Sequence, residues 1–294
     1  MQVLVDDKTY SVMSVRDGGM GRVWLLEKMF DSSFDPVYRQ RIAVKTFDFI
    51  KDEKIIENEL NIWISLDHCS VLPLKKIGRL NYHLAAIMPL LDGSLDDAIE
   101  ENLVLSEQEV LRIISDIVDG LEYAWTKFKI LHLDLKPSNV LVESGSPIRT
   151  KIADWGISRL ATKNRHASEL KSHGGATATH SQKTAYAAGT PLFMSPERFS
   201  GNWVLSPVAD IYSLGMIAVQ LSTGILPFRF GQVNPVEEIV TGSFFDNACQ
   251  ILKNRSESFR GFCLQCLHPN PDYRPSSYRD IVGHLNSIRR KGIK

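Results

Sequence analysis

The sequence has few cysteines, no excess of charge of either sign and no long apolar run. Its four cysteines are too few for a disulfide framework in a chain of 294 residues. Cys263 and Cys266 have no second pair with which to complete a four-ligand zinc site. We therefore expect both side chains on the buried face of a helix, where free cysteine behaves as a small hydrophobic group.

Lysine plus arginine and aspartate plus glutamate each number 34, so the formal net charge is zero. Without a basic field, nucleic acid and anionic membrane are not expected as partners. Apolar runs fall short of the ~18 residues of a membrane span, and acids stand near the N-terminus, where a secretory signal carries positive charge. These features predict no integral membrane span and a cytoplasmic location.

The length predicts either one large two-lobed unit or two small domains. Residues 8–90 alternate or run continuously in apolar character, as short strands do. The predicted strands are Tyr10–Met13, Arg22–Leu26, Arg41–Phe47 and Tyr82–Ile87. A helix over 54–65 interrupts them, with Ile55, Ile56, Leu60, Trp63 and Ile64 on its apolar face.

From residue 95 the pattern becomes helical, first over 95–100 and then in a long helix that follows Ser106. Ser106 and Glu109 have the spacing of a capping box. The buried stripe of this helix is expected to be Val110, Ile113, Ile114, Ile117, Leu121 and Trp125. Further helices are predicted over 208–222, 246–267 and 277–290, and a loop over 161–188. A cleft between the β-rich and helical parts is the expected ligand site.

Two motifs in the β-rich part are suggestive but weak. The first is a turn in which the backbone of Gly18, Gly19 and Gly21 can approach a phosphate, although an ordinary hairpin uses similar residues. The second is Lys45 in an apolar strand, with Glu59 on the following helix as its partner. A solvated lysine at a strand edge is the alternative.

The third motif is the strongest. Asp134, Lys136 and Asn139 lie within six residues of one another, and Asp154 follows after a short strand-like interval. An acid, a cation and an amide at this spacing, with a second acid nearby, can orient a hydroxyl, hold a phosphate and ligate a metal ion.

In their order these motifs resemble those of the eukaryotic-type (Hanks) protein kinase family, from Gly18 to Arg274, and the glycine-rich string is similar to that of bacterial members. The resemblance implies an α+β, bilobal fold in a single kinase domain over 1–294. It places a small β-rich N-lobe with one helix at about 1–87, a hinge at 88–92 and a larger, mainly helical C-lobe at about 93–290. Other matching positions are Gly156, Gly189, Thr190, Pro191, Ser195, Pro196, Glu197 and Asp210.

For catalysis, the resemblance implies that Asp134 accepts or orients the proton of the substrate hydroxyl. Lys136 would neutralise the transferring γ-phosphate. Lys45, held by Glu59, would grip the α- and β-phosphates of ATP.

For binding, the resemblance implies ATP and Mg2+, or Mn2+ in its place, with Asn139 and Asp154 as metal ligands. Counting back along the family pattern from Gly93 puts Ile87 at the gatekeeper position. The other ATP contacts are expected in the glycine-rich turn, the adenine-covering strands and the hinge, namely at Gly18, Gly19, Gly21, Val23, Ala43, Lys45, Met88 and Leu90.

Lys136 two residues after Asp134, together with Thr190, is similar to the serine/threonine branch of the family. The implied function is transfer of the γ-phosphate of ATP to Ser or Thr hydroxyls of a protein substrate, with autophosphorylation. Glu197 and Arg274 are expected to form a buried ion pair, which is costly to break.

Three positions depart from the family pattern: Arg16 stands at the first glycine of the loop, Leu133 replaces the arginine of His-Arg-Asp, and Trp155 replaces a phenylalanine in a packing role. The family arginine pairs with a phosphorylated residue, so Leu133 predicts less dependence on that modification or another route of regulation. In the long 161–188 loop, autophosphorylation and an unregulated insert are both open. The candidate sites are Thr177, Thr179, Ser181 and Thr184, and no metal site is expected at His166, His173 and His180.

Two other functions are alternatives. A pseudokinase would bind nucleotide or a partner without catalysis, and the intact catalytic positions argue against it. A kinase-like enzyme that phosphorylates a small molecule or antibiotic is disfavoured by Ser195-Pro196-Glu197 and Asp210, a pattern which such relatives lack. The sequence leaves the oligomeric state open.

Overall fold

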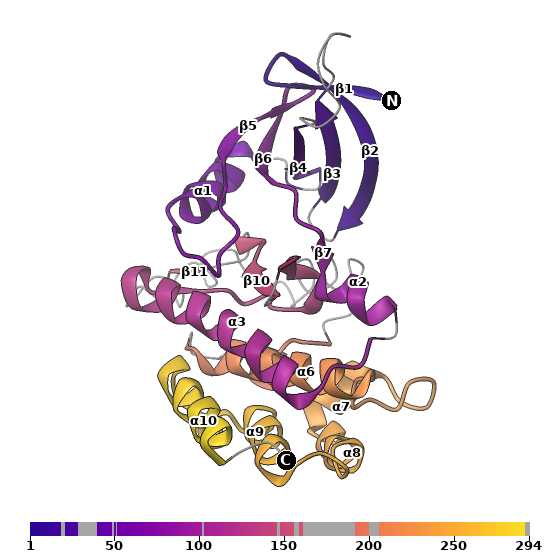
Figure 1. The fold of residues 1–294 in the computed structure, drawn as a ribbon, viewed down its shortest axis with the longest axis vertical. Helices are drawn as coiled ribbons and strands as arrows, with labels where there is room; N and C mark the ends of the chain where they lie inside the picture. The colour runs from indigo at the N-terminus through magenta and orange to yellow at the C-terminus, as the bar shows by residue number, and fades with distance from the viewer. Residues whose placement is uncertain are drawn as a thin grey trace, which may run out of the picture.

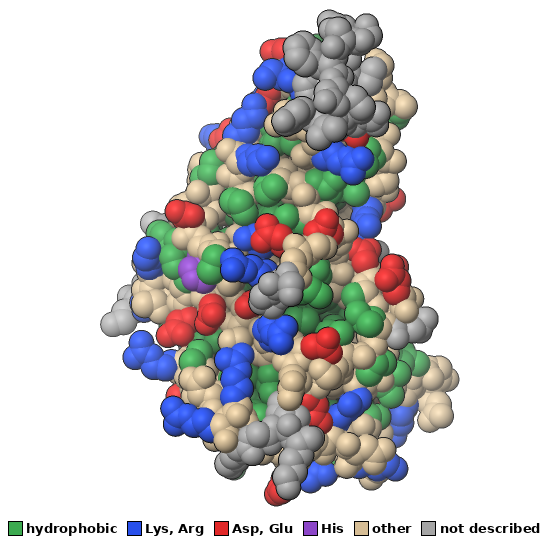
Figure 2. Space-filling view, viewed as in Figure 1, with side chains coloured by type: hydrophobic (Ala, Val, Ile, Leu, Met, Phe, Trp, Pro, Cys, Tyr) green, Lys and Arg blue, Asp and Glu red, His purple; other side chains and the backbone are tan. Residues whose placement is uncertain are grey.

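The computed structural model describes residues 1–18, 21–28, 40–48, 50, 52–101, 103–145, 148–155, 159–160, 192–199 and 206–291. They form two lobes, an upper one of strands with one helix beside them and a lower one made mainly of helices (Figure 1). Acidic and basic side chains are interspersed over the face shown in Figure 2. Among the described helices, none combines the length and the apolar character that crossing a membrane requires.

The strands of the N-terminal lobe form a closed barrel in the order β1-β2-β3-β4-β6-β5. Val5 pairs with Leu80 and closes it, so that the two outer strands bond to each other instead of presenting open edges. The predicted strands overlap β2, β3, β4 and β6, whereas β1 and β5 lie outside them because both are short and β5 contains a glycine and two charges. The bounds are β1 Gln2–Val5, β2 Lys8–Gly18, β3 Gly21–Lys28, β4 Arg41–Thr46, β5 Lys76–Leu80 and β6 His83–Pro89.

Strands β4 and β6 bury both of their faces. Val44 is paired with Ile87, and both side chains pack in the core of the barrel. Ala43 is paired with Met88, and both belong to the main core that extends through the other lobe. Because side chains alternate along a strand, Lys45 lies on the same face as Ala43.

Helix α1 (Glu53–Ile64) lies beside the barrel and confirms the predicted helix. Ile55 and Ile64 are 49% and 44% exposed, so their assignment to the apolar face was wrong. Each lies one residue outside the buried set and therefore about 100° around the helix from it. The buried residues are Ile56, Leu60 and Trp63.

The C-terminal lobe is built around α6 (Val208–Thr223), in which every residue from Ala209 to Val219 is buried. A helix that is apolar on all sides belongs at the centre of a fold. Around it lie α2 (Leu95–Glu100), α3 (Glu107–Phe128), α7 (Pro235–Thr241), α8 (Phe244–Ile251), α9 (Glu257–Cys266) and α10 (Tyr278–Lys291). Helix α7 was not predicted.

Helix α3 begins with the predicted capping box. Ser106 Oγ accepts a hydrogen bond from the Glu109 amide at 3.3 Å, and the Glu109 carboxylate accepts one from the Ser106 amide at 2.9 Å. The predicted stripe is buried except at Trp125, which is only half-buried.

The single helix predicted over 246–267 is in fact two helices, α8 and α9. Ser256 caps α9 by accepting the amide of Phe259 at 3.3 Å, and Glu107 of α3 accepts the Ser256 amide at 2.8 Å. These bonds fix the break, because Ser256 satisfies the start of a new helix. Cys263 and Cys266 lie on α9 and are fully buried, as predicted.

Two small sheets position the loop 132–139, which lies between the two lobes. Strands β7 (Gly93–Ser94), β9 (Val140–Glu143) and β10 (Arg149–Ile152) form one in the order β10-β9-β7, and β8 (Ile130–Leu131) pairs with β11 (Arg159–Leu160) to form the other. The loop 132–139 connects β8 with β9, so both of its ends are held by strands.

Candidate active site

The loop between β8 and β9 brings together three residues predicted for catalysis and metal binding. Asp134 Oδ2 accepts hydrogen bonds from Lys136 Nζ at 2.9 Å and from Asn139 Nδ2 at 3.0 Å. Asn139 Nδ2 also donates to the Asp134 carbonyl oxygen at 2.8 Å. The Asp134 and Lys136 side chains are 28% and 36% exposed, so a substrate can reach them.

Burial lowers the pKa of Lys136, but the carboxylates of Asp134, Asp154 and Asp96 raise it more and leave it above its ordinary value. The ammonium group therefore keeps its charge at neutral pH. A fixed cation beside an exposed carboxylate is suited to stabilising negative charge that develops during a reaction.

Asp154 links the two lobes. It follows β10 with a φ of 61°, in the left-handed region that few residues other than glycine adopt. Lys45 Nζ, from β4, donates a hydrogen bond to Asp154 Oδ1. Burial raises the pKa of Asp154, but Lys45 and then Lys136 lower it more and leave it below its ordinary value. The carboxylate is therefore ionised at neutral pH.

The expected ion pair between Lys45 and Glu59 is not found. Among the ion pairs that join described residues, Lys45 is paired with Asp154 and not with Glu59. Glu59 lies half-buried on α1. In this structure Asp154, whose side chain is 23% exposed, is therefore the partner of Lys45.

The glycine-rich turn is placed at the end of the β2–β3 hairpin, where Gly18 pairs with Gly21. A Cβ atom on Gly21 would lie 1.9 Å from the carbonyl oxygen of Thr46, so glycine is required there for packing against β4. Gly19 lies outside the described residues.

The positions expected to surround the adenine fall into two groups. Val23, Ala43 and Met88 pack in or against the main core, on the side of the sheet from which Lys45 reaches Asp154. Ile87 points to the opposite side, into the core of the barrel, so its placement contradicts the gatekeeper assignment. Met88 faces the side of the sheet from which Lys45 reaches Asp154, and a gatekeeper side chain has to face that side. The count along the chain missed it because a shift of one residue moves a strand side chain to the other face.

The buried carboxylate of Asp210, on α6, holds the loop between β8 and β9. Asp210 is 0% exposed and accepts hydrogen bonds from the backbone amides of His132 and Leu133 at 2.9 and 2.8 Å, and from the Tyr278 hydroxyl at 2.8 Å. His132 stacks edge-on against the fully buried Trp155, with ring centroids 4.8 Å apart, so Trp155 has the packing role predicted for it. The sequence marked Asp210 only through the resemblance.

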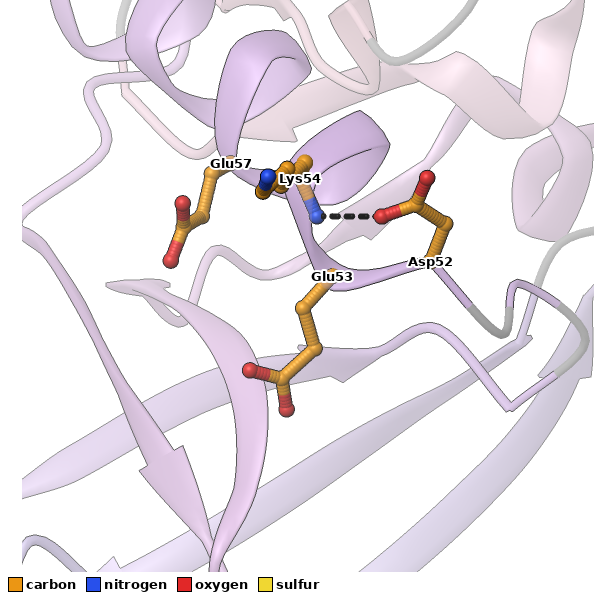
Figure 3. Close-up of a pocket in the computed structure, with 4 residues that line it drawn as sticks. All are labelled: Asp52, Glu53, Lys54 and Glu57. Carbon is orange, nitrogen blue, oxygen red and sulfur yellow. Dashed lines mark hydrogen bonds between the residues drawn. The ribbon is translucent and has the colours of Figure 1, made fainter.

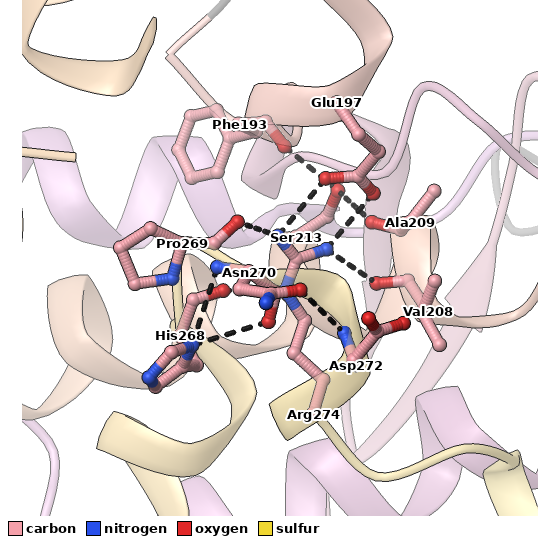
Figure 4. A network of polar contacts seen from close by, with 10 residues as sticks. All are labelled: Phe193, Glu197, Val208, Ala209, Ser213, His268, Pro269, Asn270, Asp272 and Arg274. Atoms are coloured by element: carbon pink, nitrogen blue, oxygen red, sulfur yellow. Dashed lines mark hydrogen bonds and ion pairs between the residues drawn. The ribbon is translucent and has the colours of Figure 1, made fainter. Parts of the chain in front are cut away.

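The predicted ion pair between Glu197 and Arg274 is confirmed. The two terminal nitrogens of the Arg274 guanidinium, Nη1 and Nη2, contact the two carboxylate oxygens of Glu197 at 2.9 Å each (Figure 4). The remaining donors of Arg274 reach backbone carbonyl oxygens of His268, Val208 and Pro269 at 2.7, 3.1 and 3.0 Å. The side chain of Arg274 is fully buried.

Arg16, at the position of the first family glycine, reaches the other lobe. Its Nη1 atom lies 2.8 and 3.0 Å from the two carboxylate oxygens of Asp97 on α2. The residues are 81 positions apart in sequence, and no local pattern indicated their contact.

A pocket of about 680 Å³ at the start of α1 contains none of the residues predicted for catalysis. It is lined by Asp52, Glu53, Lys54 and Glu57 (Figure 3). Asp52 accepts the amide of Lys54 at 3.0 Å, and acids in the first turn favour a helix N-terminus. Helix capping therefore accounts for Asp52, and Glu53 is the acid of the first turn.

Several predictions lie outside the described residues: the loop 161–188 with its candidate phosphorylation sites and histidines, and the motif residues Gly156, Gly189, Thr190 and Pro191. Within the described ranges, no three His, Cys, Asp or Glu side chains gather as a metal cluster.

The family model described as "Protein kinase domain" matches residues 31–285. The chain belongs to this family. NUAK family SNF1-like kinase 1 from Homo sapiens is 29% identical over 250 residues, which are 83% of this chain and 34% of that protein. Serine/threonine-protein kinase pkn3 from Myxococcus xanthus is 26% identical over 290 residues, 94% of this chain and 49% of that protein. The kinase domain thus spans about a third to a half of these relatives.

A crystal structure of the Rad53 kinase domain has the same fold, with a TM-score of 0.67 and 21% identity over 94% of this chain and 87% of that one. The α+β, bilobal fold predicted from the sequence is therefore confirmed. The protein kinase family in general uses ATP and a divalent metal ion.

Proposed function

We propose that this protein kinase transfers the γ-phosphate of ATP to serine or threonine hydroxyls of a protein, including its own. The observation that carries the proposal is the convergence of Lys45 with Asp154 and of Asp134 with Lys136 and Asn139. Phosphoryl transfer depends mainly on positioning and charge stabilisation, and these side chains provide both. Lys136 beside Asp134 supports the serine/threonine assignment, which follows from the family resemblance.

In this mechanism Asp134 orients the substrate hydroxyl and accepts its proton. Its carboxylate is held by two donors yet remains partly exposed, so that the hydroxyl can approach it. Lys136 faces the transferring phosphate and offsets the charge on its oxygens. Lys45 binds the α- and β-phosphates, and we propose that it then exchanges Asp154 for Glu59.

Asn139 and Asp154 suit a hard divalent cation, for which we propose Mg2+, with Mn2+ as a substitute. Both offer oxygen atoms, and the lowered pKa of Asp154 keeps its carboxylate ionised. Asn139 uses its amide nitrogen on Asp134, so its side-chain oxygen is the atom that can face a cation. A bound cation would neutralise phosphate oxygens there.

We propose that the adenine lies against Val23 and Ala43 and beside the end of β6, with Met88 as gatekeeper. The hinge at 88–92 then begins as β6 ends at Pro89, and Leu90 packs against the main core. With the hinge at 88–92, the N-lobe covers about 1–87 and the C-lobe about 93–290 of one kinase domain. The phosphates are placed at the glycine turn, with Gly18, Gly19 and Gly21.

The test is incubation of the purified chain with Mg2+ and γ-labelled ATP, with and without a generic basic protein. Asp134→Asn and Lys45→Met serve as controls. Label on Ser or Thr that disappears in both variants would support the proposal, and mass spectrometry would show whether residues 161–188 are modified. Melting temperatures with Mg-ATP would detect the alternative, because a pseudokinase is stabilised by nucleotide without transferring phosphate. The cytoplasmic location stays a prediction for cell fractionation.

A further inference from the structure

Leu133, which stands where the family has an arginine, has a costly backbone conformation. Its φ is 64°, in the left-handed region that a residue with a branched side chain rarely adopts. The side chain is 3% exposed and belongs to the main core. Such a conformation persists only where the surroundings hold it. Because Asp134 follows directly, whatever holds Leu133 also places Asp134.

Two charged side chains hold Leu133 from its two ends. Asp210 accepts a hydrogen bond from the Leu133 amide at 2.8 Å, and Arg198 Nη1 donates one to the Leu133 carbonyl oxygen. That carbonyl belongs to the peptide group between Leu133 and Asp134. The guanidinium thus contacts the backbone immediately before the proposed base.

Arg198 reaches the loop from a separately anchored element. It lies on the 3-10 helix Pro196–Phe199, next to Glu197. Glu197 is bound through both carboxylate oxygens by the fully buried Arg274. Glu197 and Arg198 are neighbours on this short helix but bind different partners. Glu197 binds Arg274 in the C-terminal lobe, and Arg198 binds the loop between β8 and β9.

We propose that Arg198 is a positioning residue, which fixes the peptide between Leu133 and Asp134 and so aims the Asp134 carboxylate at the substrate hydroxyl. This inference rests on the proposed function. A leucine at 133 brings no guanidinium to the loop, and Arg198 supplies one from the 3-10 helix Pro196–Phe199. A charge-assisted hydrogen bond is about twice as strong as a neutral one, so its loss releases the carbonyl and relaxes the loop.

The experiment compares Arg198→Ala and Arg198→Lys with the wild type in the full chain, by steady-state phosphorylation of a basic protein. Arg198→Ala is expected to lower kcat about tenfold, or about 1.4 kcal/mol of activation free energy, with KM for ATP unchanged. Arg198→Lys should recover part of kcat, because an ammonium group can donate to one carbonyl.

Arg255 provides a matched control. It is also half-buried, and its guanidinium donates to a backbone carbonyl, that of Ser222, within the C-terminal lobe. Arg255→Ala should lower the melting temperature without a change in kcat per folded molecule. Hydrogen exchange of peptide 130–140 gives a readout that needs no activity, and it should speed up in Arg198→Ala but not in Arg255→Ala.

The inference is overturned if Arg198→Ala keeps both the wild-type kcat and the wild-type exchange of peptide 130–140. It is equally overturned if kcat falls only as far as the folded fraction does, as in the Arg255 control. If the wild type itself transfers no phosphate, the proposed function fails, and the exchange comparison alone then decides whether Arg198 holds the loop.

Discussion

Replacing Arg274 by alanine should be among the most damaging changes in the C-terminal lobe. The guanidinium has five N–H donors, and all five are used, two on Glu197 and three on backbone carbonyl oxygens. The side chain is fully buried, and it also lies over the ring of Tyr212 at 5.0 Å. The substitution therefore removes the Arg274 donors from the Glu197 carboxylate and from three backbone carbonyl groups.

Breaking a buried ion pair by removing one partner costs about 3–5 kcal/mol, because the remaining charge is uncompensated. In a domain of this size each kcal/mol lowers the melting temperature by roughly 2–4 °C. Arg274→Ala is thus expected to lower it by about 6–20 °C. The double variant of Arg274 and Glu197 should cost less than the sum of the single variants, since it removes both charges.

Urea unfolding followed by circular dichroism measures this free energy, and calorimetry measures the melting temperature. The matched control is Arg79→Ala, which breaks a pair with Glu53 whose side chains are 49% and 52% exposed. Such exposed pairs contribute about 0–1 kcal/mol. A loss in Arg274→Ala no larger than in Arg79→Ala would refute the argument.

Three further predictions concern charge, lobe contact and capping. In the wild type, the stability contributed by ionised Asp154 is complete above its unfolded pKa of about 3.9 and is lost as the pH falls through the lower folded value. Lys45→Met removes the larger of the charges that oppose the effect of burial and leaves Lys136, so the acid loss of stability should begin at higher pH in melting temperatures measured from about pH 2 to 7. Asp154→Asn should abolish this pH dependence. Arg16→Ala breaks the contact with Asp97, in which the Arg16 and Asp97 side chains are 56% and 33% exposed. A fluorescent ATP analogue should then dissociate up to about fivefold faster at low salt. At about 1 M salt the dissociation rate should not change, because salt screens the pair. Ser106→Ala removes the cap of α3 and should cost about 1 kcal/mol in urea unfolding, whereas Ser106→Asp should not.

Predictions that depended on local spacing held. The capping box of α3 needs only Ser106 and Glu109 at the right distance along one helix, and the structure forms it. Asp134, Lys136 and Asn139 lie in one short loop between two strands, and their side chains meet there. Residues this close along the chain stay close in the fold, whatever the packing of distant elements.

Predictions that depended on which face a residue shows were less secure. Ile55 was placed on the buried face of α1 and is exposed, and Ile87 was placed at the nucleotide and lies in the core of the barrel. Both errors have one cause, since a displacement of one residue turns a side chain by about 100° in a helix and to the opposite face in a strand. Only the packing of the element against its neighbours sets that choice.

By itself the sequence determined the family and the two-lobed fold, and it predicted the residues of the candidate site, because ordered motifs carry them. The tertiary structure decided the partners: Lys45 with Asp154, Arg198 with the Leu133 carbonyl, and Arg16 with Asp97. These contacts join residues 65 to 109 positions apart. Long charged side chains have several acceptors or partners of opposite charge within reach along the sequence, and the relative placement of the folded elements selects one of them.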